Sequence, residues 1–301
     1  MFYKSPRTFI FLSLALAPLL LLGDWAGGQP GKPEIIRIGS SNTITGATQG
    51  AKETAAVKTL QAFIKEETGL ANEIERIKHW RDLAAKLAKG ELEIGVLQGY
   101  EFAWAQEKFP DIKPLALAVN VFLYPVAFIV EHKDTAGQGF ASLKGKSLTL
   151  VPEPTFVRLF IDRQAQTANA KADGFFSKIH KADNIEDAID DVVDKKVQAA
   201  AIDRAALEAY KRRKPGRFNQ LKSVVNSDPF PPAAVVYFEG KLDRSILDRF
   251  RDGLLNANKK EKGETMLNLF RLTRFDPIPV DLSKILTQTR KEYAAELGDK
   301  K

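Results

Sequence analysis

The sequence predicts an α/β protein built as two lobes, each a mixed, mostly parallel sheet flanked by helices. From residue 34 onward, segments typical of strands alternate with segments typical of amphipathic helices, and this order favours a parallel sheet covered on both faces. Residues 83–104 and 189–210 also share one pattern: an amphipathic helix, a basic break, a short apolar strand, a polar residue and a second helix. Because the pattern occurs in both halves of the chain, we expect two lobes of similar build.

The first lobe is expected to begin with a strand over residues 34–40. A helix over 51–67 follows, because apolar side chains recur there at helical spacing and Gly69 is a stop signal. Next come a strand over 71–77, a helix over 80–89 that ends at Gly90, the apolar strand 93–97 with its following helix, and a strand over 114–120.

A continuous apolar run over residues 121–131 predicts a long buried strand that crosses into the second lobe. We expect four more strands there, at 147–151, 175–180, 197–202 and 221–226, and three helices, at 156–164, 185–194 and 204–211. The strand at 234–238 is the return crossing, and helical segments at 245–272 and 282–297 rejoin the first lobe. The expected division is lobe I at residues 34–126 plus 234–301 and lobe II at 127–233.

The first 28 residues have the pattern of a signal peptide. Lys4 and Arg7 precede an apolar run from Phe9 to Leu22, which is shorter than the ~20 residues of a transmembrane helix. We expect cleavage near the small residues at 26–28 and a linker at 29–33, with an uncleaved anchor as the alternative. The chain has no cysteine, so it has no lipid-attachment cysteine, disulfide or thiolate site. A periplasmic protein that depends on its core for stability fits these features.

Composition and motifs exclude several functions. The net charge of +7 mildly favours an anionic partner, but the basic residues are spread along the chain without the basic stripe and interleaved aromatics of nucleic-acid binding. Hydrolase and phosphate-loop motifs are missing, and His79, His132 and His180 lack metal-ligand spacing. We therefore expect no enzyme, no metal and no cofactor, although a triad assembled in space from distant residues stays open.

Four expected strand-to-helix corners carry polar residues. At such a corner the unpaired N–H groups of the next helix can bind a small anion, but Ser, Thr and Asp are also common N-caps there. Four polar corners spread over two lobes favour a ligand cleft. They are Ser40 to Thr43, Gln98 to Glu101, residues 152–155, and Asp203 with Arg204.

Five segments carry a family resemblance: KGELEIGVLQGYEFAWA, PLALA, FASLKGKSLTLVPEPTFVRLF, EDAIDDVVDKKVQAAAIDRAALEAY and SDPFPPAAVVYF. On these segments the chain resembles the periplasmic substrate-binding proteins of ABC transporters, in the phosphate/phosphonate-binding group with the two-lobed type II fold. The resemblance implies a non-enzymatic protein, expected to be a monomer, that binds a small anionic ligand by hinge closure and docks on a membrane permease. A module that presents its ligand to a sensor kinase, and an exported enzyme on the same fold, are the alternatives.

The resemblance also implies which residues face the ligand. They are Ser40, Ser41, Asn42, Gln98, Gly99, Tyr100 and Glu101 in lobe I, Thr155, Phe156, Arg158 and Asp203 in lobe II, and Tyr124 near the hinge. One departure leaves the ligand's identity open. Where phosphonate-binding relatives have a Ser/Thr-rich turn, this chain has Pro-Glu-Pro-Thr-Phe, so that only Thr155 supplies a hydroxyl, while Glu153 would repel a dianion unless it points away and Arg158 could compensate.

Overall fold

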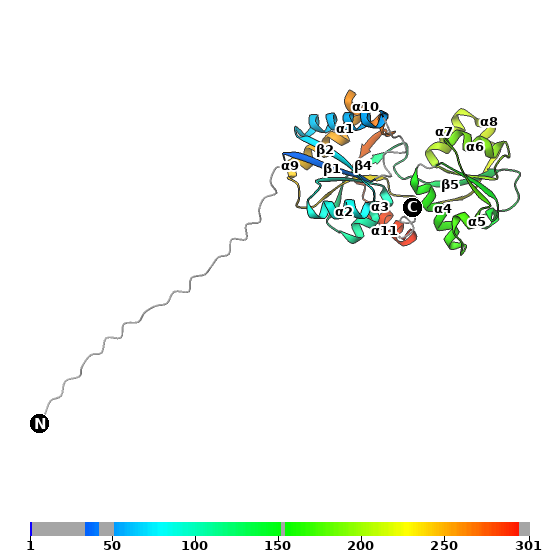
Figure 1. Ribbon diagram of the computed structural model, residues 1–301, viewed down its shortest axis with the longest axis horizontal. Coiled ribbons are helices and arrows are strands. Elements are labelled where there is room, and N and C mark those ends of the chain that lie inside the picture. Colours follow the sequence, from blue (N-terminus) through cyan, green and yellow to red (C-terminus); the bar gives the residue numbers. More distant parts are fainter. Residues whose placement is uncertain (2–33, 42–50, 152–153, 295–301) are drawn as a thin grey trace.

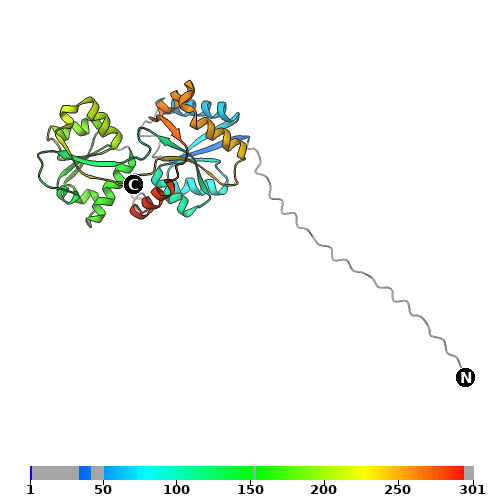
Figure 2. The same cartoon turned by 180° about the vertical axis from the view of Figure 1, so that it is seen from behind.

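The computed structural model describes residues 1, 34–41, 51–151 and 154–294. Two lobes lie side by side, each with one sheet and helices on both faces of it (Figure 1), and the view from behind shows the same division (Figure 2). The expected signal peptide and linker, and the residues Asn42 and Glu153, lie outside the described residues. Within the described ranges no helix has the length and apolar composition needed to cross a membrane.

The sheet of lobe I has six strands in the order β11-β4-β10-β3-β1-β2. Strand β1 is parallel to β2 and β3, whereas β10 is antiparallel to both β3 and β4. The strands are β1 (Ile35–Ser41), β2 (Ala71–Ile77), β3 (Ile94–Leu97), β4 (Ile112–Val119), β10 (Ala233–Phe238) and β11 (Arg274–Asp276). Helices α1 (Ala51–Thr68), α9 (Arg244–Leu255) and α10 (Glu261–Leu269) cover one face. Helices α2 (Trp80–Lys89), α3 (Gly99–Lys108) and α11 (Leu282–Glu292) lie on the other.

The sheet of lobe II has five strands in the order β7-β6-β8-β5-β9, and β6, β7 and β8 are parallel. They are β5 (Ala127–His132), β6 (Ser147–Leu150), β7 (Lys178–Lys181), β8 (Ala199–Asp203) and β9 (Leu221–Asn226). Helices α4 (Thr155–Thr167) and α5 (Ala172–Phe175) pack on one face. Helices α6 (Ile185–Val193), α7 (Arg204–Arg213) and α8 (Pro215–Phe218) lie together on the opposite side. Two short 3-10 helices, η1 (Phe140–Leu143) and η2 (Ala257–Lys259), complete the elements of the described residues.

Two segments, residues 120–126 and 227–232, cross between the sheets, and we call them the first and second crossing segments. The N–H of Phe230 in the second donates to the carbonyl of Pro125 in the first, at 2.8 Å. The predicted strand over 121–131 is therefore wrong in its first half: β5 begins only at Ala127. Pro125 has no N–H to donate to a ladder, and the chain at this point has left one sheet and not yet joined the other.

Two other expectations were wrong in detail. The predicted helix over 245–272 is divided into α9, η2 and α10, because Lys260 has an extended backbone that interrupts it. The predicted strand over 175–180 begins later, at Lys178, because α5 extends to Phe175. The division into lobes at residues 126/127 and 233/234 stays our prediction.

A carboxylate on α6 fastens three helices of lobe II. Asp190 accepts hydrogen bonds from the Tyr210 hydroxyl, the Lys214 ammonium and the Arg217 guanidinium, each at 2.6 Å. Burial alone would raise the pKa of Asp190, but these donors outweigh it and lower the pKa to about 2. The basic run at 211–214 therefore has a structural use, because Lys214 and Arg213 pair with acidic side chains of α6.

Candidate ligand-binding site

The strand-to-helix corners of lobe I lie at one edge of its sheet. Ser41 at the end of β1 is in register with Ile77 at the end of β2, and Ser40 pairs with Val96 near the end of β3. Strand β4 ends at the same edge. Ala234 of β10 pairs with Leu97 of β3 on one side and with Leu117 of β4 on the other, so the ends of β3 and β4 lie level. The first crossing segment leaves from that edge, so the corners of lobe I lie beside the path to lobe II.

The corners of lobe II lie at the matching edge of the second sheet. Strand β8 ends at Asp203, which pairs with Ala127 at the beginning of β5. Strand β6 ends nearby at Leu150, which pairs with Ala201. Both sets of corners and the two crossing segments meet in one region, which we call the junction. It is the position at which open α/β sheets hold ligands.

A hydrogen bond joins the two lobes at the junction. The hydroxyl of Tyr100, in the first turn of α3, lies 2.7 Å from Oγ1 of Thr155, the first residue of α4, and either can be the donor. Both residues are buried. Helix α4 begins after Pro154, which makes no side-chain cap to the first N–H groups of α4. Two helix starts, each positive from its dipole, and two hydroxyls therefore meet here.

Glu101 is held by lobe I. Its Oε2 accepts the Ser41 hydroxyl at 2.6 Å and the backbone N–H of Gln98 at 3.0 Å. Gln98 and Glu101 form a capping box at the start of α3. The carboxylate thus fixes the end of β1 to the beginning of α3, while the hydroxyl of the neighbouring Ser40 donates to the Ser41 carbonyl at 3.3 Å.

Gly99 lies where α3 touches the second crossing segment. A Cβ at this position would come within 1.9 Å of the Pro231 carbonyl oxygen and 2.6 Å of that of Pro232. Only a residue without a side chain allows this approach. The corner that carries Tyr100 therefore lies directly against the second crossing segment.

The predicted site residues of lobe II have mixed surroundings. Phe156 packs 5.1 Å from Phe230 of the second crossing segment, centroid to centroid. Arg158 instead forms ion pairs with Asp162 at 3.0 Å and Asp173 at 3.4 Å, which a ligand would have to displace. The role of Arg158 as a ligand contact stays a prediction.

Asp203 and Tyr124 both have structural partners. Asp203 caps α7 by accepting the Ala206 N–H at 3.2 Å, and burial raises the pKa of its carboxyl. Tyr124, in the first crossing segment, donates to Asp281 at 2.5 Å, just before α11 begins. Burial, and then this bond, raise the pKa of Tyr124 well above its usual value.

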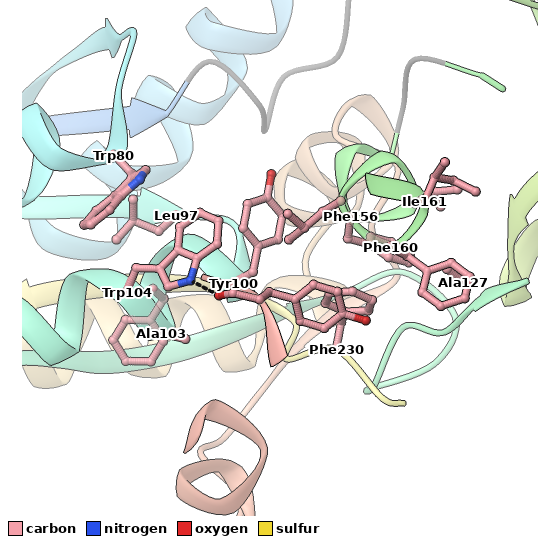
Figure 3. Close-up of a cluster of buried hydrophobic side chains, with 14 of the residues drawn as sticks. Trp80, Leu97, Tyr100, Ala103, Trp104, Ala127, Phe156, Phe160, Ile161 and Phe230 are labelled. Atoms are coloured by element: carbon pink, nitrogen blue, oxygen red, sulfur yellow. Dashed lines mark hydrogen bonds between the residues drawn. The ribbon is translucent and has the colours of Figure 1, made fainter. Parts of the chain in front are cut away.

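Four aromatic residues at the junction were not predicted: Trp80, Trp104, Phe230 and Tyr293. The Trp104 ring lies 5.1 Å from Tyr100 and 5.8 Å from Trp80, and its Nε1 donates to the Tyr293 carbonyl at 2.7 Å (Figure 3). Tyr293 in turn lies 4.7 Å from Phe230. Tyr293 is 189 residues from Trp104 in the chain, so no local pattern could have found this pair. Trp80, however, begins α2 shortly after β2 ends at Ile77, and this position at a further strand-to-helix corner was available as a signal.

The family model for the periplasmic phosphonate substrate-binding proteins of ABC transporters matches residues 44–281. The chain belongs to this family. It is therefore a solute-binding protein, and the transport role is favoured over the sensor module. The family in general is not enzymatic, and its members deliver small molecules to a permease. A search of curated protein sequences gave no match.

Solved structures share the two-lobed fold of this binding protein. XAC2383 from Xanthomonas citri, bound to chloride, has a TM-score of 0.63 at 15% identity, over 89% of this chain and 99% of that one. PhnD1 from Prochlorococcus marinus, in complex with methylphosphonate, has a TM-score of 0.59 at 14% identity, over 86% and 98%. The binding component of an ABC phosphonate transporter from Pseudomonas aeruginosa has a TM-score of 0.52 at 15% identity, over 89% and 94%. At these identities the likeness shows the fold alone.

Proposed function

We propose that this protein binds a small oxyanion of the phosphonate class at the junction and delivers it to an ABC permease. The observation that carries the proposal is the hydrogen bond between Tyr100 and Thr155. It brings together one hydroxyl from each lobe, so a ligand oxygen that bonds to both groups would hold the lobes closed. A ligand that contacts both lobes shifts the equilibrium toward closure by its differential affinity for the closed form.

The charges and dipoles of the groups at the junction favour the binding of an anion. Helices α3 and α4 direct their positive ends there, and Pro154, the N-cap residue of α4, makes no side-chain cap. The negative charge of Glu101 is partly satisfied by the Ser41 hydroxyl and the Gln98 N–H, so it is a weaker obstacle to an anion than an isolated carboxylate would be.

Titration calorimetry with methylphosphonate, inorganic phosphate and a neutral amide of similar size tests the proposal. We expect the wild-type protein to bind at least one of the two anions and not the amide. Tyr100→Phe should weaken anion binding roughly 10- to 100-fold, because a hydrogen bond to a charged group contributes about 1.5–3 kcal/mol. Tyr237→Phe is the matched control. Tyr237 is partly buried against the core of lobe I on the sheet face opposite α3, so this variant should leave affinity unchanged. Binding of the amide alone, or equal affinity in Tyr100→Phe, would contradict the proposal.

We also propose that residues 1–28 direct export to the periplasm and that the mature protein is a monomer. Mass spectrometry of the protein from a periplasmic extract should give an N-terminus near residue 28, and light scattering should give the mass of one chain. An N-terminus at Met1, or a dimer at micromolar concentration, would contradict these two points.

A further inference from the structure

The indole N–H of Trp80 is a buried donor without a partner. The residue is 6% exposed, and its Nε1 is among the few side-chain atoms in the described ranges that are buried and make no hydrogen bond. Leaving such a group unpaired costs free energy, so most buried polar atoms have partners. The neighbouring Trp104 follows that rule, because its N–H donates to Tyr293. An indole N–H can only donate, so the missing partner is an acceptor.

Trp80 lies at a corner of the same kind as Tyr100. It is the first residue of α2 and comes shortly after Ile77, which ends β2 in register with the last residue of β1. Figure 3 shows Trp80, Trp104 and Tyr100 in succession on the lobe I side, with the indole nitrogen of Trp80 on the side toward lobe II. In this view the N–H edge of the ring faces the junction.

The surroundings of Trp80 suit a negative or strongly polar acceptor. His79, the N-cap of α2, makes no side-chain cap, so the dipole of this ten-residue helix is not offset by a capping group. The Arg81 guanidinium lies 4.7 Å from the centroid of the Trp80 ring and adds positive charge. Asp82, also in the first turn, is exposed.

Trp104 lies between Trp80 and Tyr100 in Figure 3. The Trp104 ring is in contact with both, at 5.8 Å from Trp80 and 5.1 Å from Tyr100. The hydrogen bond between Tyr100 and Thr155 marks one polar position at the junction, and the unpaired Trp80 N–H marks a second one on the other side of Trp104. A ligand that uses both positions needs an acceptor for each.

We propose that Trp80 Nε1 binds a second acceptor group of the ligand, so that the preferred ligand is a phosphonate bearing a carboxylate on a short chain. This inference rests on the proposed oxyanion binding at Tyr100 and Thr155. On this inference, Trp80 is the residue that makes the protein bind carboxylate-bearing phosphonates more tightly than simple alkylphosphonates.

The test compares methylphosphonate with phosphonoacetate, 3-phosphonopropionate and 4-phosphonobutyrate by calorimetry on the full chain. At least one carboxylate compound should bind wild type more tightly than methylphosphonate does. Trp80→Phe keeps an aromatic ring but removes the N–H. It should weaken the binding of that compound roughly 10- to 100-fold while leaving the affinity for methylphosphonate unchanged. Trp104→Phe is the matched control. It should lower the melting temperature, because it loses the bond to Tyr293, without this selective effect.

A second readout does not depend on folding of a variant. In wild-type protein labelled with ¹⁵N-tryptophan, the carboxylate compound should move the Trp80 indole N–H resonance downfield, and methylphosphonate should not. If the carboxylate compounds bind no more tightly than methylphosphonate, if Trp80→Phe affects all four equally, or if the resonance does not move, the inference is overturned and the proposed function stands. If neither these four compounds nor inorganic phosphate binds wild type, the proposed function fails, and the inference with it.

Discussion

Replacing Gly99 by alanine should disturb both the second crossing segment and the junction. The added Cβ would lie 1.9 Å from the Pro231 carbonyl oxygen, where even a tight contact needs 3.0 Å, so α3 and the crossing segment must separate by about 1.1 Å. Overpacking of this kind costs about 1–3 kcal/mol. The better helix preference of alanine returns at most about 1 kcal/mol, so we expect a net loss of about 1–2 kcal/mol.

Urea unfolding followed by circular dichroism measures this loss as a lower midpoint at unchanged slope. Gly174→Ala is the matched control, because a Cβ at Gly174, in the short helix α5, meets nothing within 4 Å. Ligand affinity should fall in Gly99→Ala as well, since the displaced helix carries Tyr100. If the two alanine variants unfold at the same midpoint, α3 does not approach the second crossing segment this closely, and the predicted clash is disproved.

Two further predictions concern carboxylates. Glu101→Ala should destabilise the protein by about 1–3 kcal/mol because the buried Ser41 hydroxyl and the Gln98 N–H lose their acceptor; Glu101→Gln keeps an amide oxygen and should lose less, and equal losses would contradict the capping role. The pKa of Asp190 is lowered to about 2 in the folded protein. The ionised carboxylate therefore stabilises the fold at pH values above its unfolded pKa, which is near 4, and this stabilisation is lost as the pH falls toward 2. Asp190→Asn should therefore lower stability at pH 7 by about 1–2 kcal/mol, allowing for partial exposure, and flatten the decline in melting temperature between pH 4 and 2. The exposed pair of Asp191 with Lys196 offers the control Asp191→Asn, which should lower stability at pH 7 by less than about 1 kcal/mol.

The two-lobed fold was predictable because its elements obey local rules. Helix α2 and strands β2 and β9 have the predicted bounds, since periodic apolar residues and the stop at Gly90 mark them. Strand β11 was missed because its three residues are too few to show a period.

The candidate site was less accessible from sequence. Gln98-x-x-Glu101 is a capping-box pattern, so the role of Glu101 could have been predicted from the spacing alone. By contrast, the contacts of Trp104 with Tyr293 and of Tyr100 with Thr155 join residues that only the tertiary fold brings together. Trp80 was not predicted for a third reason: an indole is mostly apolar, and its N–H matters as a donor only when burial removes water from it.

The position of β10 in lobe I has a consequence for how the chain acquires its structure. This strand lies between β3 and β4, yet about 115 residues, including all five strands of the other sheet, separate it in the chain from the end of β4. Lobe II, in contrast, is built from one continuous stretch. As the polypeptide emerges from a ribosome or translocon, the second lobe has everything it needs before the first lobe has its central strand. We expect lobe I to be completed last, with the β3 and β4 edges exposed to chaperones until the chain returns.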